Sequence, residues 1–283
     1  YSVDHFVRPG ETISSRSMER FCGGKGLNQS IALAKAGADV YHSGMVGPDG
    51  EMLIAALREN GVHCDLVDVC ETPTGNAIIQ VDPNGQNSII LFGGANQRMT
   101  DQRMDQVLAQ FGAGDLLLIQ NEVNNLPYLV KKAAAKGLQI ALNPSPMDQK
   151  IFEIDLTHIT YFILNEIEGN GFTGETAPEN IAAAMRRQYP GARIVLTLGK
   201  RGVLYDDGEE RLTHGVYPVP VVDTTAAGDT FTGFFLARVA VGETAAEALR
   251  KASIASSLAI GVKGASVSIP TLQMVEEAGS RWD

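Results

Sequence analysis

Apolar residues along the chain follow two alternating patterns. Between Gly24 and Ala36, Leu27, Ile31 and Ala34 recur at helical spacing, and Gly37 follows as a stop signal. By contrast, residues 115–120 contain a continuous apolar run, Leu116-Leu-Leu-Ile119, which is typical of a strand buried on both faces. The same two patterns predict helices at residues 49–60, 100–111, 127–136, 178–189, 227–241, 245–261 and 271–278, and strands at 39–46, 139–142, 161–164 and 193–198. This order predicts one α/β domain, a doubly wound, mostly parallel sheet with helices on both faces.

One segment interrupts this alternation. Residues 74–82 and 87–92 flank Pro83-Asn84-Gly85-Gln86, a turn sequence, and therefore predict a β-hairpin. Its first strand carries apolar residues on both faces, Ile78 on one and Ile79 on the other. Such a hairpin is expected to be covered on both sides.

The composition narrows the class of protein. The chain has 283 residues, 44% of them hydrophobic and 20% charged, which is ordinary for a globular enzyme. A net charge of −10 argues against a partner bound through the charge of nucleic acid. No apolar run reaches the length of a membrane span, so no membrane partner is expected. Cys22, Cys64 and Cys70 form no CxxC pair, which favours reduced thiols and a cytoplasmic location. The five histidines lack zinc-ligand spacing.

Residues 223–233 carry the most informative chemistry. An apolar run leads into them and a predicted helix leads out. The small residues Ala226, Ala227 and Gly228 leave backbone N–H groups uncovered at the helix start, which suits an anion. Asp229 adds a carboxylate to the same turn. A phosphate cradle beside a general base indicates phosphoryl transfer to a hydroxyl. The alternatives are a helix-dipole partner for Asp229 and a tight packing turn.

Two further segments extend this interpretation. Phe21-Cys-Gly23-Gly24-Lys25-Gly26-Leu27-Asn28-Gln29 contains a double glycine that allows close approach of a small polyol. Asn165-Glu166-Ile167-Glu168 follows an apolar strand and offers oxygen ligands of the kind that Mg²⁺ prefers. Together with residues 223–233, these segments resemble, in order, the three signatures of the ribokinase (PfkB carbohydrate kinase) family. The resemblance runs from about Pro9 to Pro270.

The resemblance implies an ATP-dependent sugar kinase that transfers the γ-phosphate to a primary hydroxyl of a pentose such as ribose. Asp229 would be the base, and the N–H groups of Ala226, Ala227 and Gly228 would form the anion hole. The implied sugar-binding residues are Gly24, Lys25, Gly26, Asn28, Glu122 and Asp229. From the residues alone, Lys25 could equally be a solvated first-turn side chain and Glu122 could cap a helix.

The nucleotide and cation sites also follow from the resemblance. The implied nucleotide-binding residues are Asn165, Thr197, Gly199, Lys200, Gly202 and Gly228. Lys200 is included for its position only, and no specific contact is assigned to its side chain. Glu168 would hold Mg²⁺ through water, unless it is a plain first-turn helix acid. A K⁺ activator would be held by Asp223, Thr225, Ala259, Val262, Gly264 and Ser268. Asp223 could instead only hold its turn, and Asn143-Pro-Ser-Pro146 reads as a rigid connection near the site.

Residues 11–22 and 74–93 match the family's lid over the sugar, which in several members pairs with a second lid to form a homodimer. Family members usually begin with a strand that these 283 residues lack. Either the sequence is truncated or the protein lacks this strand of the sheet, and we favour truncation. The alternatives are a kinase for fructose, deoxyribose or a nucleoside, or a non-catalytic sugar- or nucleotide-binding member. A dinucleotide-dependent dehydrogenase is disfavoured, because no Gly-x-Gly-x-x-Gly motif with its acidic partner is found.

Overall fold

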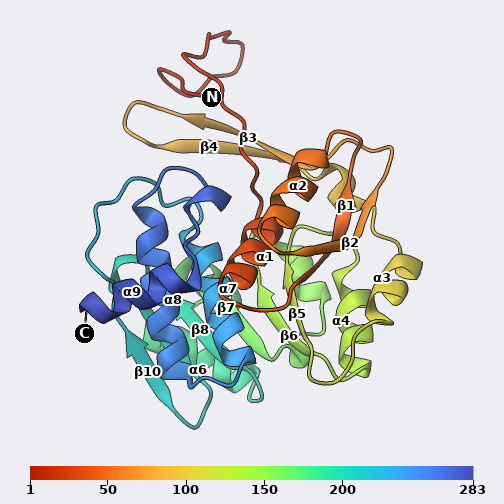
Figure 1. Ribbon diagram of the computed structural model, residues 1–283, viewed down its shortest axis with the longest axis vertical. Helices are drawn as coiled ribbons and strands as arrows, with labels where there is room; N and C mark the ends of the chain where they lie inside the picture. The colour runs from red at the N-terminus through yellow and green to blue at the C-terminus, as the bar shows by residue number, and fades with distance from the viewer. Residues whose placement is uncertain (283) are drawn as a thin grey trace.

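The computed structural model describes residues 1–282 and is built around a six-stranded sheet of order β10-β9-β8-β7-β6-β5 (Figure 1). Four of its strands are parallel, and β9 and β10 complete the sheet in antiparallel orientation. Their bounds are β5 Leu116–Gln120, β6 Gln139–Asn143, β7 Tyr161–Asn165, β8 Arg193–Thr197, β9 Val203–Asp206 and β10 Arg211–His214. The predicted mostly parallel sheet is therefore confirmed.

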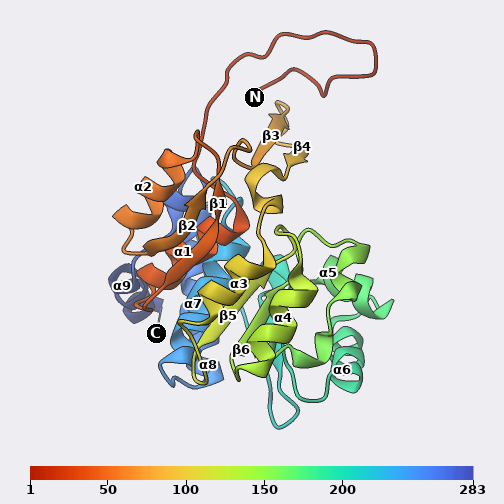
Figure 2. The same ribbon diagram turned by 90° about the vertical axis from the view of Figure 1, so that its right-hand side faces the viewer.

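Each face of this sheet supports its own hydrophobic core (Figure 2). Alternate residues of β7 point to opposite cores, since Ile163 packs with one cluster and Phe162 with the other. Helices α1 Lys25–Lys35, α7 Ala227–Ala240, α8 Ala245–Ile260 and α9 Leu272–Trp282 cover the first face. Helices α3 Asp101–Leu108, α4 Leu126–Ala135, α5 Glu166–Thr173 and α6 Pro178–Gln188 cover the second. Helices on both faces of a buried sheet are the predicted doubly wound arrangement.

Local sequence explains several helix boundaries. The Thr100 side chain accepts a hydrogen bond from the Arg103 N–H at 3.2 Å, as expected of an N-cap. Helix α9 extends four residues beyond its predicted end at Ala278, because the Trp282 ring stacks on Tyr217 with centroids 4.6 Å apart. Short 3₁₀ segments are η1 Gly94–Gln97, η2 Gln149–Glu153, η3 Leu156–His158, η4 Gly199–Arg201 and η5 Ser266–Ser268.

A second, two-stranded parallel sheet lies beside the main one. It pairs β1 Tyr41–Val46 with β2 His63–Val69, with α2 Glu51–Glu59 connecting them. Strand β2 was not predicted, because its sequence His-Cys-Asp-Leu-Val-Asp-Val contains polar residues and only Leu66 is fully buried. Within residues 1–282, no strand pairing joins this sheet to β5.

The predicted hairpin is confirmed as β3 Asn76–Val81 and β4 Asn87–Phe92, which project away from the main body (Figure 1). The chain start lies along β3, since the Val3 N–H donates to the Val81 carbonyl at 2.9 Å. Residues 11–22 form no helix or strand, and Ser17 contributes only an isolated bridge to Ser2. Thr74 anchors the base of the hairpin, because its N–H and hydroxyl both donate to Asp49, at 2.9 and 2.7 Å.

Helices α1 and α7 approach each other at Gly233. A Cβ atom there would lie 2.4 Å from the Ala32 Cβ and 2.8 Å from the Leu33 nitrogen, closer than real atoms pack. Glycine is therefore required for this crossing. Its consequence is that residues about 200 positions apart, at the starts of α1 and α7, become neighbours.

Candidate active site

Asp229 lies at the centre of this helix contact. It is the third residue of α7 and only 6% exposed. Its Oδ2 accepts a hydrogen bond from Asn28 Nδ2 and its Oδ1 one from Gln29 Nε2, both at 2.9 Å. The Lys25 Nζ lies 4.0 Å from Oδ1. Three side chains from the first turn of α1 thus hold a buried carboxylate.

The ionisation of Asp229 is set by competing effects. Burial raises the pKa of its carboxyl group, while Lys25 and the hydrogen bonds from Asn28 and Gln29 lower it. Burial is the largest effect, so the pKa lies above its usual value. The expected helix-dipole stabilisation of the ionised form is thus outweighed. Such a carboxylate takes up a proton, and can then no longer accept one, as pH falls through the raised pKa.

Glu122 is the second carboxylate of the site. It follows β5, and burial raises its pKa, with the Lys25 charge opposing and the Asp229 charge adding to the rise. Lys25 therefore lies within the electrostatic reach of both acids. The structure brings Lys25, Asn28, Glu122 and Asp229 together, as predicted.

The double glycine leaves space beside these side chains. Gly24 is the N-cap of α1 with φ of 103°, a conformation that favours glycine, and an added Cβ would meet no atom within 4 Å. A Cβ added at Gly26, by contrast, would lie 3.4 Å from Gln120 Oε1 and 3.5 Å from His42 Cε1. Gly24 thus borders open space, whereas a side chain at Gly26 would contact its neighbours at ordinary packing distance.

The start of α7 forms the predicted anion turn, with one difference. The Ala227 N–H already donates to the Thr224 carbonyl at 3.2 Å, so it is not free for a ligand. Among residues 1–282, the Ala226 and Gly228 N–H groups have no hydrogen-bond acceptor. A Cβ at Gly228 would meet open space. Of the three predicted N–H groups, two are therefore left without an acceptor, close to Asp229 in the chain.

Asn165 and Glu168 form a capping box at the start of α5. The Glu168 N–H donates to Asn165 Oδ1 and the Asn165 N–H to Glu168 Oε2, each at 2.9 Å. Glu168 is 5% exposed, and its second carboxylate oxygen makes no hydrogen bond within the described chain, so it is left for another partner. The described chain has no cluster of three or more acidic, histidine or cysteine side chains that could hold a metal ion. Asn165 and Glu168 could therefore contribute to a metal site only together with other oxygen ligands.

The predicted nucleotide-binding turn connects β8 to β9. Thr197 ends β8, and its hydroxyl donates to the Leu164 carbonyl at 3.3 Å. Gly199, Lys200 and Arg201 form η4, and Gly202 has φ of 90°. Arg201 is ion-paired with Glu166, which joins this turn to the start of α5. The turn and Asn165 are therefore neighbours at one sheet edge.

The residues predicted for a monovalent cation gather in two joined loops. Asp223 Oδ1 accepts hydrogen bonds from the Thr225 N–H and hydroxyl, at 2.9 and 2.5 Å. Its Oδ2 accepts from the Gly264 N–H at 3.0 Å. Ser268 donates to the Ala265 carbonyl at 2.8 Å, within the loop that follows Ala259 and Val262. Asp223 thus holds both loops together, which is the structural role left open above.

Three polar residues of the site were not predicted. Gln29, Asn143 and Gln120 lie directly behind Asp229, and the Gln29 amide contacts both other side chains. Gln29 follows Asn28 within the double-glycine motif, and Asn143 begins the Asn-Pro-Ser-Pro connection. Their position inside these motifs was the sequence feature that could have identified Gln29 and Asn143 as site residues.

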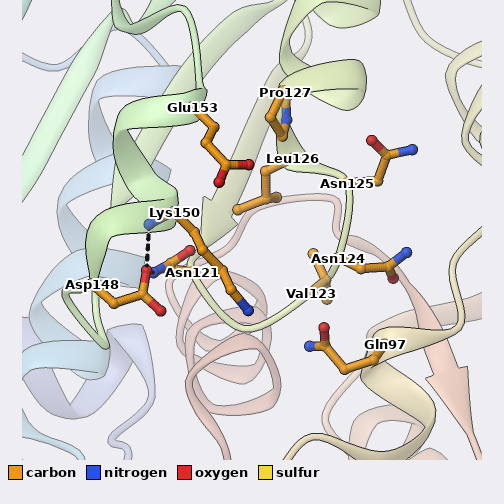
Figure 3. A pocket seen from close by; sticks show the side chains of 10 residues that line it. All are labelled: Gln97, Asn121, Val123, Asn124, Asn125, Leu126, Pro127, Asp148, Lys150 and Glu153. Carbon is orange, nitrogen blue, oxygen red and sulfur yellow. Dashed lines mark hydrogen bonds between the residues drawn. The ribbon is translucent and has the colours of Figure 1, made fainter.

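A polar cavity of about 170 Å³ lies behind the loop that carries Glu122 (Figure 3). Asn121 and Asp148 lie on one side of it and Asn124 and Asn125 on the other. The Asn121 amide donates to the Pro146 carbonyl at 2.8 Å and to Asp148 at 2.9 Å. The cavity contains none of the predicted site residues, and its side chains fix the loop on which Glu122 stands.

Comparison with known proteins supplies further findings. A sequence profile described as "pfkB family carbohydrate kinase" matches residues 1–272. Ribokinase of Bacillus subtilis (strain 168) is 36% identical over 280 residues, 97% of this chain and 93% of the relative. Ribokinase of Arabidopsis thaliana, in a structure with ribose and ATP, superposes with a TM-score of 0.87 at 33% identity, covering 98% of this chain and 94% of the other. Ribokinase of Cryptococcus neoformans in complex with ADP gives 0.85 at 32% identity, with the same coverage. No described helix is long and apolar enough to cross a membrane.

Proposed function

Because the chain belongs to the pfkB family of carbohydrate kinases, we propose that it transfers the γ-phosphoryl group of ATP to a primary hydroxyl of a pentose such as ribose. The observation that carries this proposal is the buried Asp229 carboxylate, held by α1 next to the uncovered N–H groups that start α7. The choice of a pentose is supported by the relatives that match nearly the whole chain. These relatives are ribokinases, and the structure of one of them contains ribose and ATP.

In this mechanism Asp229 is the general base. A sugar hydroxyl in the open space by Gly24 donates its proton to the ionised carboxylate as its oxygen attacks the γ-phosphorus. The bond between that phosphorus and the bridging oxygen breaks, and ADP leaves. Asn28 and Glu122 hold the sugar through its other hydroxyls, together with the backbone of Gly24 and Gly26. The Lys25 ammonium, 4.0 Å from Asp229, offsets part of the negative charge that the two acids bring to the site.

The phosphoryl group is stabilised from the start of α7. The Ala226 and Gly228 N–H groups, which have no acceptor within the described chain, would donate to the charge that develops on the phosphoryl oxygens, and one such donor contributes roughly 3–4 kcal/mol. Asn165, Thr197, Gly199, Lys200 and Gly202 line the nucleotide side at the neighbouring sheet edge. Bulk solvent is excluded when the β3–β4 hairpin covers the sugar.

Two cations belong to the proposal. Glu168 would hold the water shell of a Mg²⁺ ion through its remaining carboxylate oxygen. When bound, Mg²⁺ neutralises phosphate charge. K⁺ would bind between the Asp223–Thr225 turn and the loop of Ala259, Val262, Gly264 and Ser268, the two segments that Asp223 already connects.

The hairpin also supports a homodimer. Both of its faces expose large apolar side chains, Ile78 and Ile90 on one, Ile89 and Leu91 on the other, between 46% and 60% exposed. One face can cover the sugar and the other can pair with the hairpin of a second copy. A cytoplasmic location completes the proposal, since the three described cysteines are free.

The test is ADP release with ribose, deoxyribose, fructose and nucleosides as acceptors. We expect the highest kcat/KM with a pentose. Asp229→Asn should keep sugar affinity within a few-fold and lower kcat by ~10²–10⁴. Asp65→Asn, an exposed aspartate on β2, is the matched control and should leave kcat unchanged. Wild-type turnover in Asp229→Asn would remove the assigned base, and nucleotide binding without turnover would favour a binding protein instead.

A further inference from the structure

A chain of buried amides connects the central sheet to the candidate base. The Asn143 amide, at the end of β6, donates to the Ile163 carbonyl at 2.9 Å. Gln29 Nε2 donates to Asn143 Oδ1 at 3.0 Å and to Asp229 Oδ1 at 2.9 Å. Gln120 Nε2 donates to Gln29 Oε1 at 2.6 Å. We propose that Gln29 is a positioning residue for the base and that Asn143 fixes the direction in which the Gln29 amide donates.

The direction of each hydrogen bond follows from one backbone group. The Ile163 carbonyl can only accept, so the Asn143 nitrogen must face it and the Asn143 oxygen must face Gln29. Facing an acceptor, Gln29 must present its nitrogen. That nitrogen carries two hydrogens, and the second points at Asp229. The backbone of β7 thus determines, through two side chains, that Asp229 receives a donor.

The opposite orientation of Gln29 is disfavoured on every side. Gln29 is 1% exposed and Asn143 is 9% exposed, so water does not compensate for a lost bond. A rotated amide would place its oxygen against both Asn143 Oδ1 and Asp229 Oδ1. It would also place its nitrogen against the Gln120 nitrogen. Leaving such buried groups unpaired is costly, so a single arrangement is populated.

This inference rests on the proposed role of Asp229. Gln29 occupies one carboxylate oxygen and Asn28 the other, which fixes the plane of the carboxylate and leaves its remaining lone pairs for the sugar hydroxyl. Asn28 belongs to the proposed sugar contacts, whereas Gln29 lies behind the base, within the network of β5 and β6. Gln29 therefore acts on the reaction through Asp229 and not through the sugar.

The charged groups that face Asp229 also determine what a pH profile reports. Two charged groups act on Asp229: Lys25 on α1 and Glu122 on the loop after β5. Burial raises the pKa of Glu122 as well. The neighbouring groups from β5 and β6, Gln120 and Asn143, are neutral amides. A Glu122→Gln background therefore leaves Asp229 as the acid of this cluster that titrates.

The experiment compares Gln29→Met and Asn143→Leu with the parent protein in the Glu122→Gln background. Gln29→Met keeps the length of the side chain and removes both donors. We expect the acidic limb of the kcat profile to move to higher pH by about one to two units, because an ionised acceptor loses a hydrogen bond. At the plateau, kcat should fall ~10-fold from loss of positioning. The sugar KM should stay within about threefold, since Gln29 makes no sugar contact.

Asn143→Leu should move the limb in the same direction by less, because Gln29 keeps its bond to Asp229 but loses its orienting acceptor. If Gln29→Met does not fold, the pH profile of Asn143→Leu tests the inference in its place. Gln139→Met, at the exposed far end of β6, is the matched control and should change neither quantity. An unmoved limb with unchanged kcat in both test variants, or a loss confined to KM, would overturn the inference.

A carbon-13 carboxyl NMR titration separates this inference from the proposed function. Asp229 is assigned by its absence in Asp229→Asn, and its pKa is then read without turnover. We expect a higher pKa in Gln29→Met than in the parent protein. If the parent phosphorylates no sugar of the panel, the proposed function fails, while the titration still supports or overturns the contact between Gln29 and the base.

Discussion

The contact of α1 with α7 can be tested by adding one methyl group, as Gly233→Ala. The new Cβ would lie 2.4 Å from the Ala32 Cβ, whereas carbon atoms pack about 3.5–4.0 Å apart. The helices must therefore separate by roughly 1 Å. The bonds from Asn28 and Gln29 to Asp229, now 2.9 Å, would then stretch to nearly 4 Å, beyond hydrogen-bond distance.

Two consequences follow from this displacement. Overpacking should lower the free energy of unfolding by about 1–3 kcal/mol, as measured by urea titration. Misplacing the base by about 1 Å should lower kcat ~10²-fold in the ADP-release assay. Both losses arise from one substitution 1 helical turn beyond Asp229, because Gly233 sets the distance at which the two helices meet.

Gly228→Ala is the matched control on the same helix. Its Cβ would meet no atom within 4 Å, so stability should change by less than about 0.5 kcal/mol. Activity should still fall, since the methyl group occupies the space in front of the uncovered N–H groups. Wild-type stability and kcat in Gly233→Ala would refute the reasoning about the helix contact. Equal destabilisation by both variants would show that Gly233 is not a special position.

The remaining predictions concern three other regions. Burial lowers the pKa of His42 to about 4, so the unfolded state takes up a proton first as pH falls below 6.5. Urea titrations should therefore show about 2 kcal/mol less stability at pH 4.5 than at pH 7 from this group, a difference that His42→Gln abolishes. Ile90→Asp in the lid hairpin should convert a dimer to a monomer in light scattering, while Asn84→Asp at its turn should not. Exchanging K⁺ for tetramethylammonium should lower kcat several-fold, and unchanged activity would remove the cation site.

The repeating core elements could be predicted because their signals are local. The apolar runs of β5 and β8, the Thr100 cap and the Asn84-Gly85 turn each depend on neighbouring residues. Strand β2 could not be predicted, since it gains its conformation from pairing with β1 and not from its own alternation. The end of α9 likewise depends on a ring contact between Trp282 and Tyr217, 65 positions earlier.

The candidate site shows the same division. The turn before Asp229 and the Asn165–Glu168 pair could be predicted because each is a short sequence motif. The Asn165–Glu168 pair also forms a capping box, which depends only on neighbouring residues. The amide network was not predicted, because Gln29 meets Gln120, Asn143 and Asp229 across separations of 91, 114 and 200 residues. The motif also does not indicate that the Ala227 N–H donates to the Thr224 carbonyl within the turn.

The separation between α1 and α7 has a consequence for the synthesis of the chain. Ribosomes add about 5–20 residues per second, so Asn28 and Gln29 are made about 10–40 s before Asp229. During that time the amides of Asn28 and Gln29 lack the Asp229 carboxylate as an acceptor, and α1 lacks the surface of α7 around Gly233 to pack against. A ribosome-bound chain that ends before residue 223 should therefore expose α1 to protease. Release of the last quarter of the chain would both bury this helix and complete the reaction centre in one step.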